Sequence, residues 1–240
     1  FIVAIDGPAG SGKSTVAKNV AKKMDFFYID TGAMYRAVTL KALREKVNLN
    51  DASAVADVAR RSKVGLNTNN KGRQRIFLNG EDVTDKIRTP ELTRCVAFIA
   101  RVKRVREHMV KLQRKLGESA DSVLEGRDIG TVVFPNANIK FYLDASFKER
   151  TMRRFKELKA SKPDIRLRDI ANDLKVRDRK DITRKYAPLK KADDAICIDT
   201  TRLSIEEVID RLLGIIKPDF ARLPRQRRGE QTKSARRADP

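Results

Sequence analysis

The sequence predicts an α/β fold with a five-stranded parallel sheet flanked by helices and a small antiparallel β insert. Apolar residues at three- and four-residue spacing, typical of helices, alternate with five short apolar runs, at residues 1–6, 26–29, 122–124, 139–143 and 195–198. Between residues 64 and 87 the pattern changes to short runs separated by turn residues such as Asn79 and Gly80. That pattern indicates an antiparallel meander.

The helices are expected in chain order from their boundary residues. One helix should follow the glycine-rich residues 7–15, a second should follow residues 30–32, and Asp51 should cap a weaker third. Pro90 opens one long helix that is expected to end at Gly117. A capping box of Ser204 and Glu207 predicts the start of the last helix, expected over residues 205–216.

Residues 7–15 read Gly-Pro-Ala-Gly-Ser-Gly-Lys-Ser-Thr, which is the phosphate-loop pattern G-x-x-x-x-G-K-[ST] between a strand and a helix. Glycines let successive backbone N–H groups turn inward around a polyphosphate, and the helix N-terminus adds partial positive charge. Lys13 can reach the β- and γ-phosphates, and the Ser14 hydroxyl can hold Mg²⁺. The alternative is a glycine turn that meets no nucleotide, which the complete flanking pattern disfavours. The sequence therefore predicts a nucleoside triphosphate site made of Gly7, Pro8, Ala9, Gly10, Ser11, Gly12, Lys13, Ser14 and Thr15.

The net charge of +21 also suggests polyanionic ligands. Part of the excess lies in residues 218–240, which are poor in apolar residues and are expected to form a basic disordered tail. Such a tail is either a solvated extension or a weak contact for RNA. We therefore expect no nucleic-acid partner beyond weak association through the tail.

The lengths of the apolar runs and the cysteine content indicate in which cellular compartment the chain is expected. No apolar run approaches the ~20 residues of a membrane span. Cys95 and Cys197 lie far apart, so they imply neither a disulfide nor a metal cluster, and both are expected to serve packing. A reducing, cytoplasmic location and a monomeric chain are the expectations.

Two absent motifs and a set of arginines indicate which class of phosphate-loop protein this chain belongs to. The chain lacks the base-reading N-K-x-D stretch of GTPases and the Asp-Glu strand end of motor ATPases. Guanidinium groups bind phosphate oxygens in pairs, and a kinase whose acceptor is already phosphorylated must neutralise two phosphate groups at once. Arginines suited to this task lie near strand ends and in polar helices: Arg36, Arg106, Arg127, Arg177, Arg179 and Arg184.

The chain resembles the bacterial-type cytidylate kinases, a family of nucleoside monophosphate kinases with a phosphate-loop core. The most specific stretches are Asp-Thr-Gly-Ala-Met-Tyr-Arg at residues 30–36 and Gly-Arg-Asp-Ile-Gly-Thr at residues 126–131. Further matching stretches lie at residues 5–15, 78–84, 104–107, 125–135 and 176–189. The resemblance runs from Phe1 to about Lys217 and leaves only the tail uncovered.

This resemblance implies Mg²⁺-dependent transfer of the ATP γ-phosphoryl group to CMP or dCMP. It also implies three parts: a core formed by residues 1–37 and 100–217, a monophosphate-binding lobe at residues 38–99 that contains the β insert, and a short helical lid at residues 153–173. The family positions that hold the acceptor nucleotide correspond to Thr31, Arg36, Arg106, Arg127, Asp128, Arg177, Asp181 and Arg184.

The chemistry of the acceptor supports these roles. Cytosine carries an exocyclic amine beside acceptor atoms, so a carboxylate and a guanidinium can read it, and Asp128 with Arg106 and Arg127 can supply both. Arg177 and Asp181 suit the sugar hydroxyls, whereas Arg36 and Arg127 can both reach the acceptor phosphate. Asp30 and Tyr35 complete the expected site, with helix capping and lobe packing as their respective alternatives. Catalysis is expected from Lys13, Arg127, Arg177 and Arg179, with Arg179 on the lid.

Two other functions stay open on this sequence. A pocket that reads the exocyclic amine only weakly would belong to a kinase for UMP or another monophosphate. A basic, RNA-associated protein that uses nucleotide as a switch would also carry a phosphate loop, but it has no use for the stretch at residues 126–131.

Overall fold

The computed structural model describes residues 1–68, 74–160 and 163–222. Its main sheet contains β1 (Ile2–Asp6), β2 (Phe27–Asp30), β6 (Ser122–Gly126), β7 (Ile139–Asp144) and β8 (Ile196–Asp199). The strand order is β2-β6-β1-β7-β8, and every pairing is parallel. The predicted five-stranded parallel sheet is therefore confirmed. Its register places Asp6 beside Gly126 and Asp30 beside Glu125, so the acidic residues at the strand ends share one edge.

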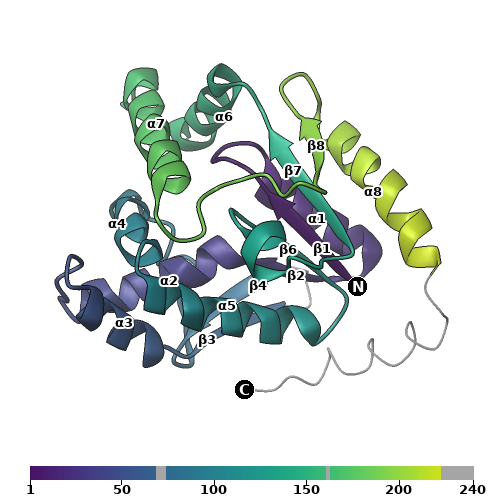
Figure 1. Cartoon of the computed structure of the whole chain (residues 1–240). Helices are drawn as coiled ribbons and strands as arrows, with labels where there is room; N and C mark the ends of the chain where they lie inside the picture. Colours follow the sequence, from purple (N-terminus) through teal and green to yellow (C-terminus); the bar gives the residue numbers. More distant parts are fainter. Residues whose placement is uncertain (69–73, 161–162, 223–240) are drawn as a thin grey trace.

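Helices cover both faces of this sheet because successive strand residues point to opposite sides (Figure 1). Val3 and Ile5 pack into one buried cluster with α1 (Lys13–Met24) and α8 (Ile205–Ala221). Ala4, Ile29 and Leu124 pack into the other cluster with α2 (Thr31–Arg44) and α5 (Lys103–Glu118). The sheet is thus buried on both faces, as parallel sheets require.

The antiparallel meander predicted after residue 64 is also confirmed. β3 (Val64–Thr68), β4 (Gln74–Leu78) and β5 (Glu81–Asp82) form a three-stranded antiparallel sheet. Asn79 and Gly80 take the left-handed backbone conformation at the turn between β4 and β5. The preceding helix α3 (Ala52–Arg60) begins as expected, because the Asp51 carboxylate accepts hydrogen bonds from the Ser53 and Ala54 N–H groups.

The single long helix expected from Pro90 to Gly117 was wrong. Two helices occupy this span, α4 (Pro90–Ala100) and α5, and they are separated at Arg101 and Val102. Val102 has an extended backbone and a buried side chain, so the break lets α4 pack against α2 while α5 packs against the sheet. Gly117 does not stop the helix. It lies inside α5, where a Cβ atom would come within 2.7 Å of the Phe134 ring.

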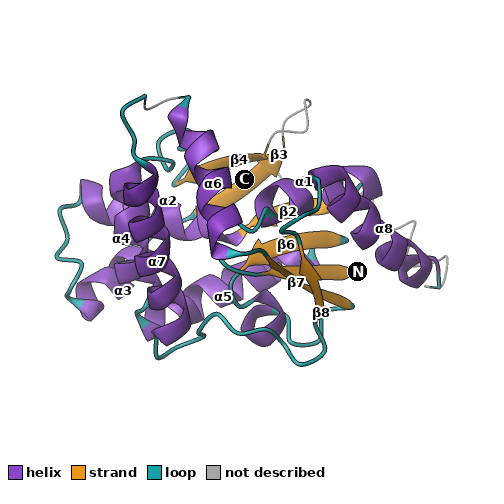
Figure 2. Cartoon of the chain, turned by 90° about the horizontal axis from the view of Figure 1, so that it is seen from above, coloured by secondary structure: helices purple, strands orange, loops and turns teal. Residues whose placement is uncertain are grey.

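Beyond the carboxyl ends of the strands stand α6 (Phe147–Lys159) and α7 (Leu167–Thr183), which pack side by side (Figure 1, Figure 2). The expected lid at residues 153–173 takes in the end of α6, the connection to α7 and the start of α7. A short π-helix (Ile129–Val133) follows β6 and brings its backbone over the end of β1.

The last helix extends further than expected. α8 continues to Ala221 through Pro218, so the first residues of the expected tail are helical. The reason is aromatic packing: the Phe220 ring lies 5.4 Å from the Phe1 ring and 5.0 Å from the Phe26 ring, measured between centroids. The rest of the expected tail, residues 223–240, lies outside the described residues.

The described part of the chain also shows whether any helix could span a membrane and how far the two cysteines are buried. Within it, no helix is long and apolar enough to span a bilayer. Cys95 is partly buried, whereas Cys197 is exposed on the edge strand β8, so the packing role expected for Cys197 was wrong. As the edge strand of the main sheet, β8 has one side that pairs with no other strand of the described residues.

Candidate active site

The phosphate loop joins β1 to α1 and is shaped by its glycines. Gly7 approaches β7 so closely that a Cβ atom would lie 2.0 Å from the Leu143 carbonyl oxygen. Gly10 and Gly12 take left-handed φ angles of 79° and 87°. No side chain caps the N-terminus of α1, and no acidic residue occupies its first turn. The loop and helix end can therefore offer backbone N–H groups to an anion, and the predicted binding of a triphosphate there stays a prediction.

Lys13 lies buried within this loop. Its Nζ donates to the Pro8 carbonyl oxygen at 2.6 Å and lies 3.4 Å from the Ser11 hydroxyl. Among the described residues it has no ion pair within 4.0 Å. Burial, and secondly the positive charge of Arg127, lower the pKa of Lys13 to about 7. An added phosphate would supply the missing negative charge and restore the full positive charge of Lys13.

Two carboxylates at the strand ends support the loop. Asp6 accepts hydrogen bonds from the N–H groups of Ile129 and Gly130, at 2.9 and 2.7 Å, and burial raises its pKa to about 6. Glu125 accepts from the Tyr28 hydroxyl at 3.1 Å, and burial raises its pKa. Glu125 was not among the predicted site residues. Its place at the end of a buried strand, beside the phosphate loop, was the signal that could have found it.

A second cluster of charges lies across from the phosphate loop. Asp128 pairs with Arg106 through one oxygen and lies 3.5 Å from Arg184 through the other. Asp181 binds Arg127 at 2.9 Å and lies 3.7 Å from Arg184. These sequence-predicted residues therefore form one network, although α5, the segment after β6, and α7 with its C-terminal end contribute them separately: Arg106, Arg127, Asp128, Asp181 and Arg184.

The third part of the candidate site lies at the junction of β2 and α2. Asp30 caps α2 by accepting from the Ala33 N–H at 2.7 Å, and its other oxygen accepts from Arg36 at 3.2 Å. Thr31 donates to the Glu125 carbonyl oxygen at 2.7 Å. Tyr35 is buried with the Arg106 guanidinium 5.5 Å from its ring centroid, and its hydroxyl has no hydrogen-bond partner among the described residues. Asp30 thus carries out the capping role considered as its alternative and also faces Arg36.

The two predicted arginines of α7 differ in their surroundings. Arg177 is half-buried, and burial and the charge of Arg127 lower its pKa to about 10. Arg179 is exposed and is not brought into the cluster. Its expected catalytic role stays a prediction.

Arg150 positions the phosphate loop but belongs to none of the motifs found in the sequence. Arg150 on α6 donates to the Ala9 carbonyl oxygen of the phosphate loop at 3.1 Å and contacts the Asp178 carboxylate at 2.5 Å. Its Nε also donates to the Ala145 carbonyl oxygen at 3.1 Å. These contacts tie the loop to α6 and α7. In the sequence Arg150 is one of many charged residues in a polar helix, so no signal could have found it.

The side chains of the described residues form no metal site of their own. No group of three or more His, Cys, Asp or Glu residues there could hold an ion by itself. A phosphate loop needs no such group, because its serine hydroxyl and the nucleotide's own oxygens complete the coordination.

Comparisons with known proteins agree with this geometry. The cytidylate kinase family model matches residues 3–218. A cytidylate kinase from Caldanaerobacter subterraneus subsp. tengcongensis is 48% identical over 215 residues, which cover 90% of this chain and 94% of that protein. A cytidylate kinase from Bacillus subtilis is also 48% identical, covering 90% of this chain and 96% of that protein. A crystal structure of an uncharacterized protein from Eubacterium ventriosum shares the fold, with a TM-score of 0.51 and 14% identity over 90% of this chain and 98% of that one. The chain therefore belongs to the cytidylate kinase family.

Proposed function

We propose that this protein transfers the γ-phosphoryl group of ATP to CMP or dCMP, giving ADP and the corresponding diphosphate. The observation that carries the proposal is the network in which Asp128 lies between Arg106 and Arg184. A carboxylate can accept a hydrogen bond from the exocyclic amine of cytosine, and the neighbouring guanidinium groups can donate to its ring nitrogen and carbonyl oxygen.

ATP is proposed to bind along the phosphate loop, with its γ-phosphoryl group facing this network. The close approach of Gly7 to Leu143 and the unpaired Lys13 fit a polyphosphate at this position. Mg²⁺ would be held by the Ser14 hydroxyl together with phosphate oxygens, and Glu125 is near enough to Ser14 to orient that hydroxyl. The bound ion would neutralise phosphate charge during transfer.

The acceptor phosphate needs no general base, because its oxygen is already ionised near neutral pH. Arg36 and Arg127 are near enough to Arg177 for their charges to lower its pKa, and the three guanidinium groups would neutralise the charge of the two phosphate groups. Catalysis then consists of positioning and charge neutralisation. Water would be excluded if α6 and α7 close over the nucleotides.

Three divisions of the chain follow from this proposal. Residues 38–99 form the acceptor-binding lobe, residues 1–37 and 100–217 form the core, and residues 153–173 form the lid. α7 already contacts the lobe, where Lys180 Nζ lies 5.4 Å from the centroid of the Phe98 ring. We also propose that the enzyme acts as a monomer in the cytoplasm, since a reducing compartment would keep Cys95 and Cys197 as free thiols.

The experiment measures ADP release from Mg-ATP with CMP, dCMP, UMP, AMP and GMP offered one at a time. Rapid turnover with CMP and dCMP, and at least about tenfold slower turnover with the others, is the expected result. Turnover with UMP alone would retain the kinase but reject the assignment of Asp128 to the amine. A folded chain that binds ATP and uses none of the acceptors would overturn the proposed reaction.

A further inference from the structure

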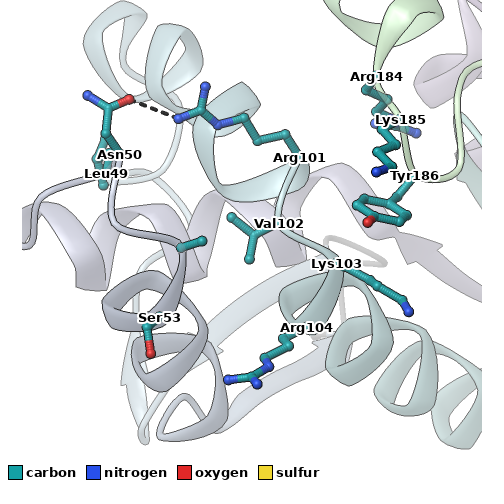
Figure 3. Close-up of a pocket in the computed structure, with 11 residues that line it drawn as sticks. Leu49, Asn50, Ser53, Arg101, Val102, Lys103, Arg104, Arg184, Lys185 and Tyr186 are labelled. Atoms are coloured by element: carbon teal, nitrogen blue, oxygen red, sulfur yellow. Dashed lines mark hydrogen bonds between the residues drawn. The ribbon is translucent and has the colours of Figure 1, made fainter.

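A cleft of about 710 Å³ borders the acceptor network at Arg184, and its other lining residues are not used by the proposed reaction (Figure 3). Its walls come from three segments: residues 49–53 before and within α3, residues 101–104 at the α4–α5 junction, and residues 184–186 after α7. Ligand sites for small molecules typically enclose about 300–1,000 Å³, so the cleft has the size of a single small-molecule site.

The charge of the lining is entirely positive. Five lining residues are cationic, namely Arg101, Lys103, Arg104, Arg184 and Lys185, and none is acidic. In the part of the chain that the structure describes, neither Arg104 nor Lys185 has an ion pair. The nearby Asp51 is occupied by capping α3. Lys103 pairs with Glu107 at 3.8 Å, and Arg184 pairs with Asp128 and Asp181. Among the described residues, Arg101, Arg104 and Lys185 are therefore the lining cations whose charge no ion pair balances.

The start of α5 adds to this charge. Val102, at its N-cap, offers no side-chain hydrogen bond, and the first turn holds no acidic residue. Helix N-termini normally attract acidic side chains, because their N–H groups and dipole are positive. Here Lys103 and Arg104 occupy that turn instead, which disfavours the helix end unless an anion binds beside it.

The floor of the cleft is apolar and aromatic. Leu49, Val102 and the Tyr186 ring supply it, and the Nζ atoms of Lys103 and Lys185 lie 5.9 and 5.6 Å from the Tyr186 ring centroid. Figure 3 shows the Tyr186 ring and Lys103 on the same side of Val102. A ligand that carries a flat ring and several negative charges would use both the ring face and the cations.

We propose that this cleft binds a nucleoside polyphosphate as a regulatory ligand, with its base against Tyr186 and its phosphates among the basic residues at the start of α5. The site goes beyond the proposed reaction, because Lys103, Arg104, Lys185 and Tyr186 are not among the residues assigned to phosphoryl transfer.

The cleft and the acceptor site share two structural links. Arg184 lines the cleft, and its guanidinium contacts Asp128 and Asp181. The Ala100 carbonyl oxygen at the α4–α5 junction accepts a hydrogen bond from Arg106 at 3.2 Å. A ligand that fixes this junction and Arg184 therefore changes the affinity for the acceptor nucleotide.

The test is calorimetric titration of CTP into the full chain, with the active site already filled by CMP and a non-hydrolysable ATP analogue with Mg²⁺. One further CTP per chain is expected to bind. The double variant Lys103→Ala/Lys185→Ala should weaken this binding at least tenfold. The matched control Lys18→Ala/Lys22→Ala removes the same charge from exposed positions of α1 and should bind CTP as the original chain does.

Inorganic pyrophosphate is the second probe, and it should bind at least tenfold more weakly because it has no ring for Tyr186. The proposal is overturned if the filled enzyme binds no CTP, if the double variant binds it unchanged, or if pyrophosphate binds as tightly. CTP should also change the KM for CMP in the original chain and not in the double variant. If the proposed reaction is wrong, turnover of CMP will be absent. If the proposed cleft site is wrong, the Lys103→Ala/Lys185→Ala variant will bind CTP as the original chain does.

Discussion

The Arg150 guanidinium lies 2.5 Å from the Asp178 carboxylate and 3.1 Å from the Ala9 carbonyl oxygen. Both side chains are nearly buried, with exposed fractions of 9% and 12%. A single side chain thereby joins the phosphate loop to the helix that carries Arg177 and Asp181. The phosphate loop and α7 are consequently held together through the same ion pair.

Arg150→Ala is expected to lower the free energy of unfolding by about 3 kcal/mol, because Asp178 would keep a buried charge without its partner. The variant should also raise the KM for ATP, since the loop loses a donor at Ala9. Urea unfolding and steady-state kinetics measure the two effects.

The double variant Arg150→Met/Asp178→Leu separates stability from positioning. Replacing both charges by apolar side chains of similar size should recover most of the unfolding free energy, whereas the KM for ATP should stay high. A double variant with both properties restored would show that the pair only stabilises the fold.

Lys13 makes the stability of the nucleotide-free protein depend on pH. Its pKa is about 7 in the folded chain, and the ordinary lysine value is 10.5. Between these values the unfolded chain holds a proton that the folded chain has lost, so the unfolding free energy should rise as the pH increases from 7 to 10. The rise should be absent in Lys13→Met. Parallel pH curves for the two proteins would contradict this account.

Lys13→Met should also lower kcat by about a hundredfold or more, because removing one positioned donor from a transition state typically costs that much. The KM for CMP should change far less, since Lys13 belongs to the donor side. Near-normal turnover would remove Lys13 from the catalytic groups.

Parallel-strand patterns and local turn chemistry made most of the fold predictable from the sequence. The buried strands have continuous apolar runs, and Asp51 and Ser204 cap helices as their residue types indicate. The break at Val102 could not be found in this way, since apolar residues continue through it at helical spacing. Only the separate packing of α4 and α5 creates the break. The extension of α8 through Pro218 depends on Phe1 and Phe26, more than 190 residues away in sequence.

The same distinction, between local sequence patterns and packing in three dimensions, applies to the site residues. Residues within motifs, such as Lys13 and Asp128, could be predicted as site residues because phosphate and base recognition need those residue types. Arg150 acts through contacts made in three dimensions, and its neighbours in sequence give no sign of those contacts. Glu125 differs, because its place at the end of a buried strand was a signal in the sequence. Arg179 shows the opposite case, since it lies within a matching stretch but is exposed in this structure.

Asp128→Asn is expected to raise the KM for CMP by about tenfold or more while leaving the KM for ATP nearly unchanged. The amide would no longer balance Arg106 and Arg184, and a lost hydrogen bond to a charged group costs about 1.5–3 kcal/mol. Asp194→Asn, at an exposed carboxylate paired with Lys140, is the matched control and should change neither constant. Equal increases in both KM values would assign Asp128 to the donor or metal side instead.

Tyr35 offers a final test, because its buried hydroxyl has no hydrogen-bond partner among the described residues. Burial raises the pKa of Tyr35 to about 12, so the hydroxyl stays protonated and can donate to a ligand. Tyr35→Phe should therefore leave the unfolding free energy unchanged or raise it by up to about 1 kcal/mol, while raising the KM for CMP by about fivefold. Tyr28→Phe is the control, since that hydroxyl already donates to Glu125 and its loss should cost about 1 kcal/mol of stability. A Tyr35→Phe variant that is less stable and binds CMP normally would show that the hydroxyl serves packing rather than the acceptor.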